Sequence, residues 1–235
     1  MEPLRVVRLA AAALSILTTL AATRAGAEEV AADKPYLSQR VPPRSNAFEL
    51  TLASGYAQGF GTLQPGIGVP AVANAGVGID ASVGYRVDPH YSLSVGGEYQ
   101  GLNTERDESS VYGAAVVVAI AYHVSPSSRV DPWLQLGSGY RMLWLVPASP
   151  APTTLLVGPE LVRLRFGLDL RVSPDVAVAP VIGADATLFV FRDAVTSDAI
   201  ANPKLSTFVF AGLQGRVDIG GSGRSGGSGG ARASR

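Results

Sequence analysis

The chain has 235 residues, with 19 basic and 19 acidic side chains and no cysteine. A net charge of zero provides no basic surface for nucleic acid, and the lack of cysteine excludes a disulfide framework, a thiolate nucleophile and a thiolate metal site. Lys34 and Lys204 are the only lysines. Arginine is the cation preferred where charges pair away from bulk water, so its dominance favours buried ion pairs.

Residues 1–27 have the organisation of a signal peptide. Arg5 and Arg8 form a basic region, residues 9–22 form an apolar run, and residues 25–27 are an Ala-Gly-Ala cleavage site. The apolar run is shorter than the roughly 20 residues that a membrane-spanning helix needs. Residues 28–46 mix charge with proline and show no period, so we expect a flexible periplasmic lead-in.

Residues 47–219 contain segments in which apolar and polar side chains alternate. In the second segment Val77, Ile79 and Ala81 fall on one face, because successive strand residues point to opposite sides. The eight segments cover 47–58, 75–87, 91–102, 111–124, 132–145, 155–172, 176–191 and 205–219. Each is long enough for a tilted strand to cross a bilayer. Residues 220–235 are rich in Gly and Ser and are expected to form a disordered tail.

The connectors between these segments alternate in length. Compact proline-containing turns occupy 88–90, 125–131 and 173–175, and longer loops occupy 59–74, 103–110, 146–154 and 192–204. Short turns at one rim, long loops at the other and an even number of strands are typical of outer-membrane barrels. The pattern predicts an all-β fold, an eight-stranded antiparallel up-and-down transmembrane β-barrel.

The polar face distinguishes a membrane barrel from a soluble, lipocalin-like barrel, whose apolar face would point inward. This face is rich in glycine and serine, lacks lysine, and carries six acidic and six arginine side chains. The predicted lumen charges are Glu49, Asp80, Arg86, Glu98, Arg141, Arg163, Arg165, Asp169, Arg171, Asp185, Arg216 and Asp218. Equal numbers of each sign suit a narrow interior in which every charge needs a partner.

Aromatic side chains on the apolar face lie at two heights. The predicted girdles consist of Tyr85, Tyr91 and Tyr122 beside the short turns, and of Tyr56, Tyr99, Tyr112 and Trp144 toward the long loops. The stretch from Tyr112 to Tyr122 spans roughly 33 Å along a strand, or about 25 Å of height when the strand is tilted. That height matches the apolar band between the two aromatic girdles of a membrane barrel.

In strands, connectors and girdles, region 47–219 resembles the small eight-stranded outer-membrane β-barrels of Gram-negative bacteria, of the OmpX and OmpA transmembrane-domain type. The resemblance implies a monomer in the outer membrane with both termini periplasmic. It also implies contact with outer-membrane lipid, lipopolysaccharide and the barrel-insertion machinery. One feature departs from the pattern, because the last strand ends at Ile219 and not at the aromatic residue that the insertion machinery reads.

Candidate chemistry is sparse along the chain. The two histidines, His90 and His123, fall beside short turns, away from the long-loop side where the resemblance places the catalytic histidines of outer-membrane enzymes. His123 faces inward by alternation, and we expect it to hydrogen-bond a barrel carboxylate. The acidic loop 103–110 lacks the glycine-turn spacing of a calcium loop. We therefore assign no catalytic residue, no cofactor and no metal site.

The sequence thus predicts a non-enzymatic barrel with a plugged, salt-bridged lumen and with loops in structural or interaction roles. Loops 59–74 and 146–154 are apolar for exposed connectors, so they fold over the mouth, rest among headgroups or form a surface for a partner. Two other functions stay open. One is a narrow OmpW-like channel for small hydrophobic molecules, which needs an apolar lumen, and the other is a lipid-modifying enzyme.

Overall fold

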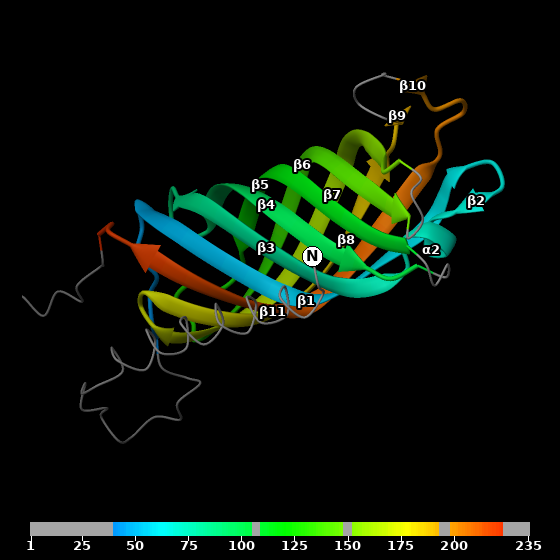
Figure 1. Cartoon of the computed structure of the whole chain (residues 1–235). Coiled ribbons are helices and arrows are strands. Elements are labelled where there is room, and N and C mark those ends of the chain that lie inside the picture. The colour runs from blue at the N-terminus through cyan, green and yellow to red at the C-terminus, as the bar shows by residue number, and fades with distance from the viewer. Residues whose placement is uncertain (1–39, 105–108, 148–151, 193–197, 223–235) are drawn as a thin grey trace, which may run out of the picture.

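The predicted strands close into one antiparallel barrel in the computed structural model, which describes residues 40–104, 109–147, 152–192 and 198–222. The eight long strands are β1 (Ala47–Gln64), β3 (Ala75–Arg86), β4 (Tyr91–Leu102), β5 (Ser109–His123), β6 (Val130–Pro147), β7 (Thr154–Ser173), β8 (Val176–Leu188) and β11 (Leu205–Ile219). Each pairs with its neighbour in chain order, and β11 pairs with β1 to close the cylinder. The predicted fold class is therefore confirmed (Figure 1).

The connections differ at the two ends of the barrel (Figure 1). At one end, here called the short-turn end, residues 87–90, 124–129 and 174–175 join β3 to β4, β5 to β6 and β7 to β8. The opposite, long-loop end carries β2 (Ile67–Gly68), α2 (Val69–Val72), β9 (Phe191–Arg192) and β10 (Asp198–Ala199).

The turn between β3 and β4 shows why a proline corner suits the short-turn end. The Oδ1 atom of Asp88 accepts hydrogen bonds from the backbone N–H groups of His90 at 2.7 Å and Tyr91 at 2.9 Å. These bonds satisfy donors that a tight turn leaves unpaired. Pro89 has no N–H group of its own, so no ladder hydrogen bond is lost at this position.

Side chains along the long strands alternate between the lumen and the outer surface. Large apolar side chains face outward, with exposed fractions that reach 64% at Val118 on β5 and 59% at Ile182 on β8. An apolar outer band around a polar interior is the arrangement of a barrel in lipid. Within the described residues, no helix is long and apolar enough to cross a membrane.

Several strand bounds differ from the sequence-based expectation, since β6 begins at Val130 and not at 132, and β8 ends at Leu188 and not at 191. Two further differences concern β1 and β7. β1 continues past the predicted end at residue 58 to Gln64, where it pairs with β2. β7 contains a bulge, because Glu160 pairs with Thr187 and Val162 pairs with the adjacent Ala186. A bulge inserts one extra residue, here between Glu160 and Val162, and so reverses which side chains point inward. On the N-terminal side of this bulge, toward the long loops, even-numbered residues of β7 such as Glu160 face the lumen, whereas after it the odd-numbered residues do.

Near the two chain ends, the described residues begin at Arg40 and end at Ser222. The predicted signal peptide, most of the predicted tail, and residues 105–108, 148–151 and 193–197 of the predicted loops lie outside the described residues. Residues 40–46 of the predicted lead-in lie at the short-turn end, where Ser45 pairs with Ser222. Gly220 and Gly221, at the start of the predicted tail, adopt φ angles of 75° and 74° and turn the chain toward this pair.

We expect Val118→Arg to lower the free energy of unfolding by about 2–4 kcal/mol, the cost of a cation at the bilayer midplane, and Val124→Arg by about 0–1 kcal/mol. Val118 lies near the middle of β5, whereas Val124 directly follows its last residue at the short-turn end. Denaturant unfolding of the barrel in lipid vesicles measures both effects. Equal losses for the two variants would show that the apolar band is not immersed in lipid.

Candidate functional site, the ion-paired lumen

The twelve charged side chains predicted to face the lumen lie inside the barrel. Eleven of them are at most 5% exposed. The twelfth, Asp80, has a side chain that is 24% exposed and borders an internal cavity. Period-two alternation alone therefore places these side chains in one compartment, although they come from seven different strands.

Two further carboxylates, Asp131 and Glu160, are fully buried among these charges. Simple alternation sends Glu160 to the lipid side, but the β7 bulge turns it inward. The sequence pattern places Asp131 in a connector, but β6 begins at Val130, and Asp131 pairs with Asp169 across the ladder. Among the described residues, the lumen thus holds eight carboxylates and six guanidiniums, because Asp131 and Glu160 add to the six acidic and six arginine side chains predicted there.

These charges form two clusters along the barrel axis. The loop-side cluster, nearer the long loops, contains Asp80, Glu98, Arg141, Glu160, Arg163, Arg165 and Asp185. The turn-side cluster, nearer the short turns, contains Glu49, Arg86, His123, Asp131, Asp169, Arg171, Arg216 and Asp218. Each cluster has three guanidiniums and four carboxylates.

Shared carboxylates hold the loop-side cluster together. Arg141 Nη2 lies 2.9 Å from Glu160 Oε2 and 2.8 Å from Asp185 Oδ2. Arg163 donates to the other oxygen of Glu160 at 2.6 Å and to Asp80 at 3.0 Å. Because Glu160 bridges two guanidiniums, the cluster is a network in which the loss of one member leaves another charge buried without a partner.

Aromatic rings and a glycine make room for these long side chains. The guanidinium of Arg141 lies 4.5 Å from the ring centre of Phe208, and that of Arg165 lies 4.7 Å from Phe210. Such stacking favours a cation that has little access to water. On the neighbouring strand, a Cβ atom at Gly183 would lie 2.5 Å from Cδ of Arg165. Only a residue without a side chain leaves the space that this arginine occupies.

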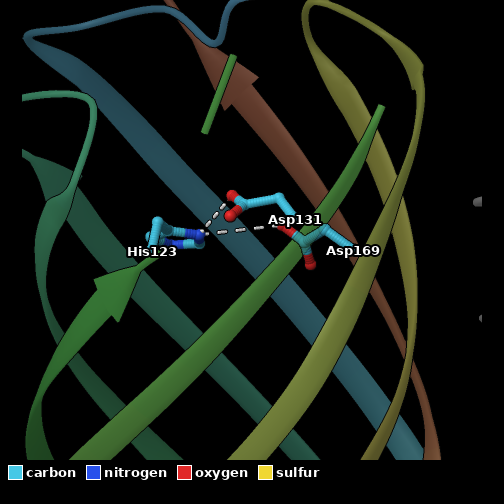
Figure 2. A group of neighbouring side chains, drawn as sticks. All are labelled: His123, Asp131 and Asp169. Atoms are coloured by element: carbon cyan, nitrogen blue, oxygen red, sulfur yellow. Dashed lines mark hydrogen bonds and ion pairs between the residues drawn. The ribbon is translucent and has the colours of Figure 1, made fainter. Parts of the chain in front are cut away.

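Within the turn-side cluster, His123 points toward Asp131 and Asp169, as Figure 2 shows. His123 Nδ1 lies 2.8 Å from Asp131 Oδ2 and 4.0 Å from Asp169 Oδ2, so the predicted hydrogen bond to a carboxylate is present. His123 Nε2 lies 3.5 Å from Nη2 of Arg86 and 3.4 Å from Nη1 of Arg216. Both guanidiniums can only donate hydrogen bonds. Nε2 is therefore the acceptor, and the proton of the neutral ring sits on Nδ1 and is donated to Asp131.

His123, Asp131 and Asp169 are residue types that can bind metal, and their ligand atoms lie within 4.8 Å of one another. The carboxylate oxygens already have other partners. Asp131 Oδ1 accepts the Ser125 N–H at 2.9 Å, and Asp169 Oδ1 accepts the Trp133 indole N–H at 2.8 Å.

Charge also opposes a metal at this position. Arg216 forms an ion pair with the second oxygen of Asp169, and its guanidinium also lies beside the ring of His123. A bound cation would have to displace the His123 proton and stand against these guanidiniums. The group fits a hydrogen-bonded structural triad better than a metal site. Both ring nitrogens of His123 are engaged, so the ring is not free to activate a nucleophile.

A polar cavity of about 30 Å³ separates the two clusters. Its lining includes Thr51, Ser82, Ser94, Gln135 and Gln214. The hydroxyls of Thr51 and Ser82 lie 2.5 Å apart, and Gln135 donates to Ser94 at 3.3 Å. This space admits about two water molecules, so it is a small hydration site within the lumen.

The long-loop end of the lumen is closed by apolar side chains, here called the apolar cap. The cap consists of Ala57, Leu63, Val69, Ala73, Leu102, Val111, Leu143, Leu156, Phe189 and Phe208. Val69 begins α2, and Ala73 caps its end, so the apolar part of loop 59–74 folds onto the barrel mouth. The sequence left three placements open for this loop, and the structure shows the first of them. Figure 1 shows α2 at this end of the barrel.

The predicted girdle aromatics lie on outward-facing positions of their strands. Tyr91 and Tyr122 pack with ring centres 5.2 Å apart near the short turns, and Tyr99 and Tyr112 lie 6.2 Å apart toward the long loops. Tyr140 adds another outward ring that is 44% exposed. Strands β7, β8 and β11 contain no Tyr or Trp. The girdles therefore follow β1, β3, β4, β5 and β6 and leave three adjacent strands without them.

No protein-family model matches the sequence, and no curated protein matches it. Solved structures do match. Neisserial surface protein A is 13% identical with a TM-score of 0.52, and the match covers 72% of this chain and 96% of that one. The outer membrane protein AlkL, determined in lipid bilayers, is 10% identical with a TM-score of 0.46 over 81% and 98% of the two chains. Ail, the attachment invasion locus protein of Yersinia pestis, is 11% identical with a TM-score of 0.43 over 72% and 97%.

The chain therefore has the fold of the small eight-stranded outer-membrane β-barrels, and the resemblance predicted from the alternation pattern is confirmed at the level of the fold. At 13% identity the likeness to Neisserial surface protein A extends to the fold alone.

We expect Arg141→Met to lower the free energy of unfolding by about 3–5 kcal/mol, because it leaves Glu160 and Asp185 buried without this partner. The double variant R141M/E160Q removes one of the uncompensated charges and should recover part of the loss. Asp80→Asn is the control, since Asp80 is partly exposed and Arg163 keeps other carboxylate partners. Denaturant unfolding in vesicles compares the three. An R141M barrel as stable as D80N would contradict the network.

Gly167→Ala should destabilise the barrel by about 1–3 kcal/mol, because its Cβ atom overpacks the lumen. That atom would lie 2.3 Å from the indole of Trp133, which donates to Asp169. Gly101→Ala is the matched control, since no atom lies within 4 Å of the corresponding position. Thermal unfolding and Trp133 fluorescence in a Trp144→Phe background report the two effects. Identical behaviour of the two alanine variants would show that Trp133 is not packed as described.

Proposed function

We propose that this protein is a non-enzymatic, non-conducting outer-membrane barrel that acts through its outer surface and loops, in a structural or interaction role. The observation that carries the proposal is the succession of layers along the lumen. The apolar cap, the loop-side cluster, the small polar cavity and the turn-side cluster follow one another from the long loops to the short turns. An eight-stranded barrel has room for little beyond side chains, so these layers fill its cross-section.

The proposed location is the outer membrane, with outer-membrane lipid and lipopolysaccharide around a monomer that the barrel-insertion machinery inserts. The apolar outer band and the fold support this location. Both described chain ends, Arg40 and Ser222, lie at the short-turn end. We place this end in the periplasm, because short turns are periplasmic in outer-membrane barrels.

The placement of both histidines supports a non-enzymatic role. His123 is fully buried, and its ring is held between Asp131 and two guanidiniums. His90 lies in the short turn before β4, where its Nδ1 atom is 2.7 Å from the His123 backbone carbonyl. Neither ring is presented to a substrate at the long-loop end, where a lipid-modifying enzyme would need a general base.

A surface partner would meet the outer part of the first long loop. Val69 of α2 is buried in the apolar cap, whereas the turn formed by Pro65 and Gly66 is exposed. The proposed partner surface within 59–74 is therefore this turn, to which loop 146–154 contributes through its described flanks.

A narrow conduit for small hydrophobic molecules is the alternative function. The apolar cap favours it, because such a molecule would enter an apolar mouth. Below the cap, however, the molecule would have to separate Arg141 from Glu160 and Asp185, and opening these buried ion pairs is costly. The ion-paired lumen therefore favours a non-conducting barrel over a conduit.

We expect the purified, refolded protein to give no steady single-channel current in a planar lipid bilayer, because two clusters of paired charges lie across the lumen beneath the apolar cap. A general porin inserted under the same conditions is the positive control. Heat-modifiable gel migration of the same sample verifies that the barrel is folded. Reproducible unitary currents from the folded protein would overturn the closed-lumen proposal in favour of a conduit.

A further inference from the structure

The segment that leads into β1, residues 40–46, is extended and lies against the short-turn end; it is called the strap here. Val41 and Pro43 are buried, whereas the residues on either side of Val41 are exposed. In an extended segment alternate side chains share a face, so Val41 and Pro43 both point toward the barrel. The strap, which the sequence predicts to be part of a flexible lead-in, thus has an apolar face that points toward the barrel.

The strap takes a short path over the barrel mouth. At one end, the Val41 N–H donates to the Ser127 carbonyl in the turn between β5 and β6, at 3.1 Å. At the other end, Ser45 pairs with Ser222, which follows β11. β7 and β8 separate these two attachment points around the barrel. Four residues extend at most about 14 Å, whereas the three strand intervals from β6 to β11 span roughly 19 Å along the rim of a barrel whose strands are tilted by about 40°. The strap is therefore too short to follow the rim and crosses the opening as a chord.

An ion pair holds the strap against the turn between β7 and β8. Arg44 contacts both carboxylate oxygens of Asp175 in the turn between β7 and β8, with Nη2 at 3.2 Å from Oδ2. A bidentate pair of this kind fixes orientation as well as distance. Arg44 also donates to the Gly220 carbonyl at 3.4 Å. A Cβ atom at Gly221 would lie 2.5 Å from the Ser45 carbonyl oxygen, so the chain after β11 can approach the strap only through glycine.

The strap lies at the end of the lumen that holds the turn-side cluster. Arg86 and His123 are the last residues of β3 and β5, and Asp218 is the penultimate residue of β11. Side chains at strand ends are the ones that an open mouth would expose, yet each of these is at most 4% exposed.

We propose that the strap is a plug that closes the short-turn mouth, excludes water from the turn-side cluster and is locked by the Arg44–Asp175 pair. It provides a second closure, opposite the apolar cap. The proposal rests on the proposed closed lumen and adds to it a removable element made from the chain's own N-terminal segment.

Because the protein contains no cysteine, a single introduced thiol reports water access at a chosen point. Ser92→Cys is the reporter, since Ser92 is 4% exposed and faces the lumen near the start of β4, beside the turn-side cluster. Ser125→Cys, in an exposed turn, is the fully reactive control. Ser206→Cys, fully buried near the long-loop end, is the control for global unfolding. The probe is a small charged methanethiosulfonate reagent added to the folded full-length protein.

With the strap intact, we expect S92C to react far more slowly than S125C. Arg44→Asp should raise the S92C rate about tenfold, the change in open population that about 1.4 kcal/mol of lost strap stability produces. The charge-swapped pair R44D/D175R should restore protection, and S206C should stay protected throughout. Adding Val41→Asp to R44D removes the apolar contact as well and should raise the S92C rate further.

Two results would overturn the strap as a plug. One is an S92C rate that equals the S125C rate while the strap is intact. The other is an S92C rate that does not change in the V41D/R44D variant. Neither result depends on conductance. A non-conducting barrel in which the S92C rate does not respond to changes in the strap would therefore contradict the plug but not the closed lumen. Unitary currents with a protected S92C would sink the closed lumen instead.

Discussion

A narrow lumen that is filled almost entirely by side chains requires the charges inside it to pair with one another. In the described part of the chain, eight carboxylates and six guanidiniums meet that requirement by sharing partners, as when Glu160 pairs with both Arg141 and Arg163. This explains why arginine and not lysine supplies the interior cations, since a planar guanidinium with five donors can bond several carboxylates at once. It also explains the inward-facing glycines, because a side chain at Gly183 would occupy the space of Arg165.

The same constraint specifies the pairing of the strands. A slip of one residue in a strand moves its inward side chains to the lipid face, and in each of the seven strands that bear lumen charges this would carry an arginine or a carboxylate into hydrocarbon. The apolar outer band would tolerate many registers, but the ion-paired interior tolerates one. The two clusters, the cavity between them, the apolar cap and the strap together describe a filled cylinder. Its free surfaces are the lipid-facing wall and the loops, and we place its function there.

Much of this arrangement could be predicted from the sequence, because period-two burial is visible directly in the order of apolar and polar residues. The strands, the alternation of connectors and the inward direction of His123 follow from it. Glu160 could not be found in this way, because a bulge is set by packing between strands and reverses the pattern locally. The ordered strap could not be predicted from the sequence either. Its order depends on a contact between Arg44 and Asp175, 131 residues apart, while its own sequence reads as an irregular proline-rich segment. The apolar loop 59–74 left several placements open, since local composition does not say which surface an apolar loop covers.

The interior ion pairs are tested most directly by NMR of the arginine Nε–H groups, in the folded barrel transferred to deuterated water. Arg86, Arg141 and Arg163 each donate from Nε to a buried carboxylate at 3.1 Å or less, whereas Arg40 is exposed on the strap. We predict that the Nε–H signals of the three lumen arginines persist long after that of Arg40 has exchanged, because water does not reach them. Exchange of the lumen signals as fast as that of Arg40 would contradict a closed, ion-paired lumen.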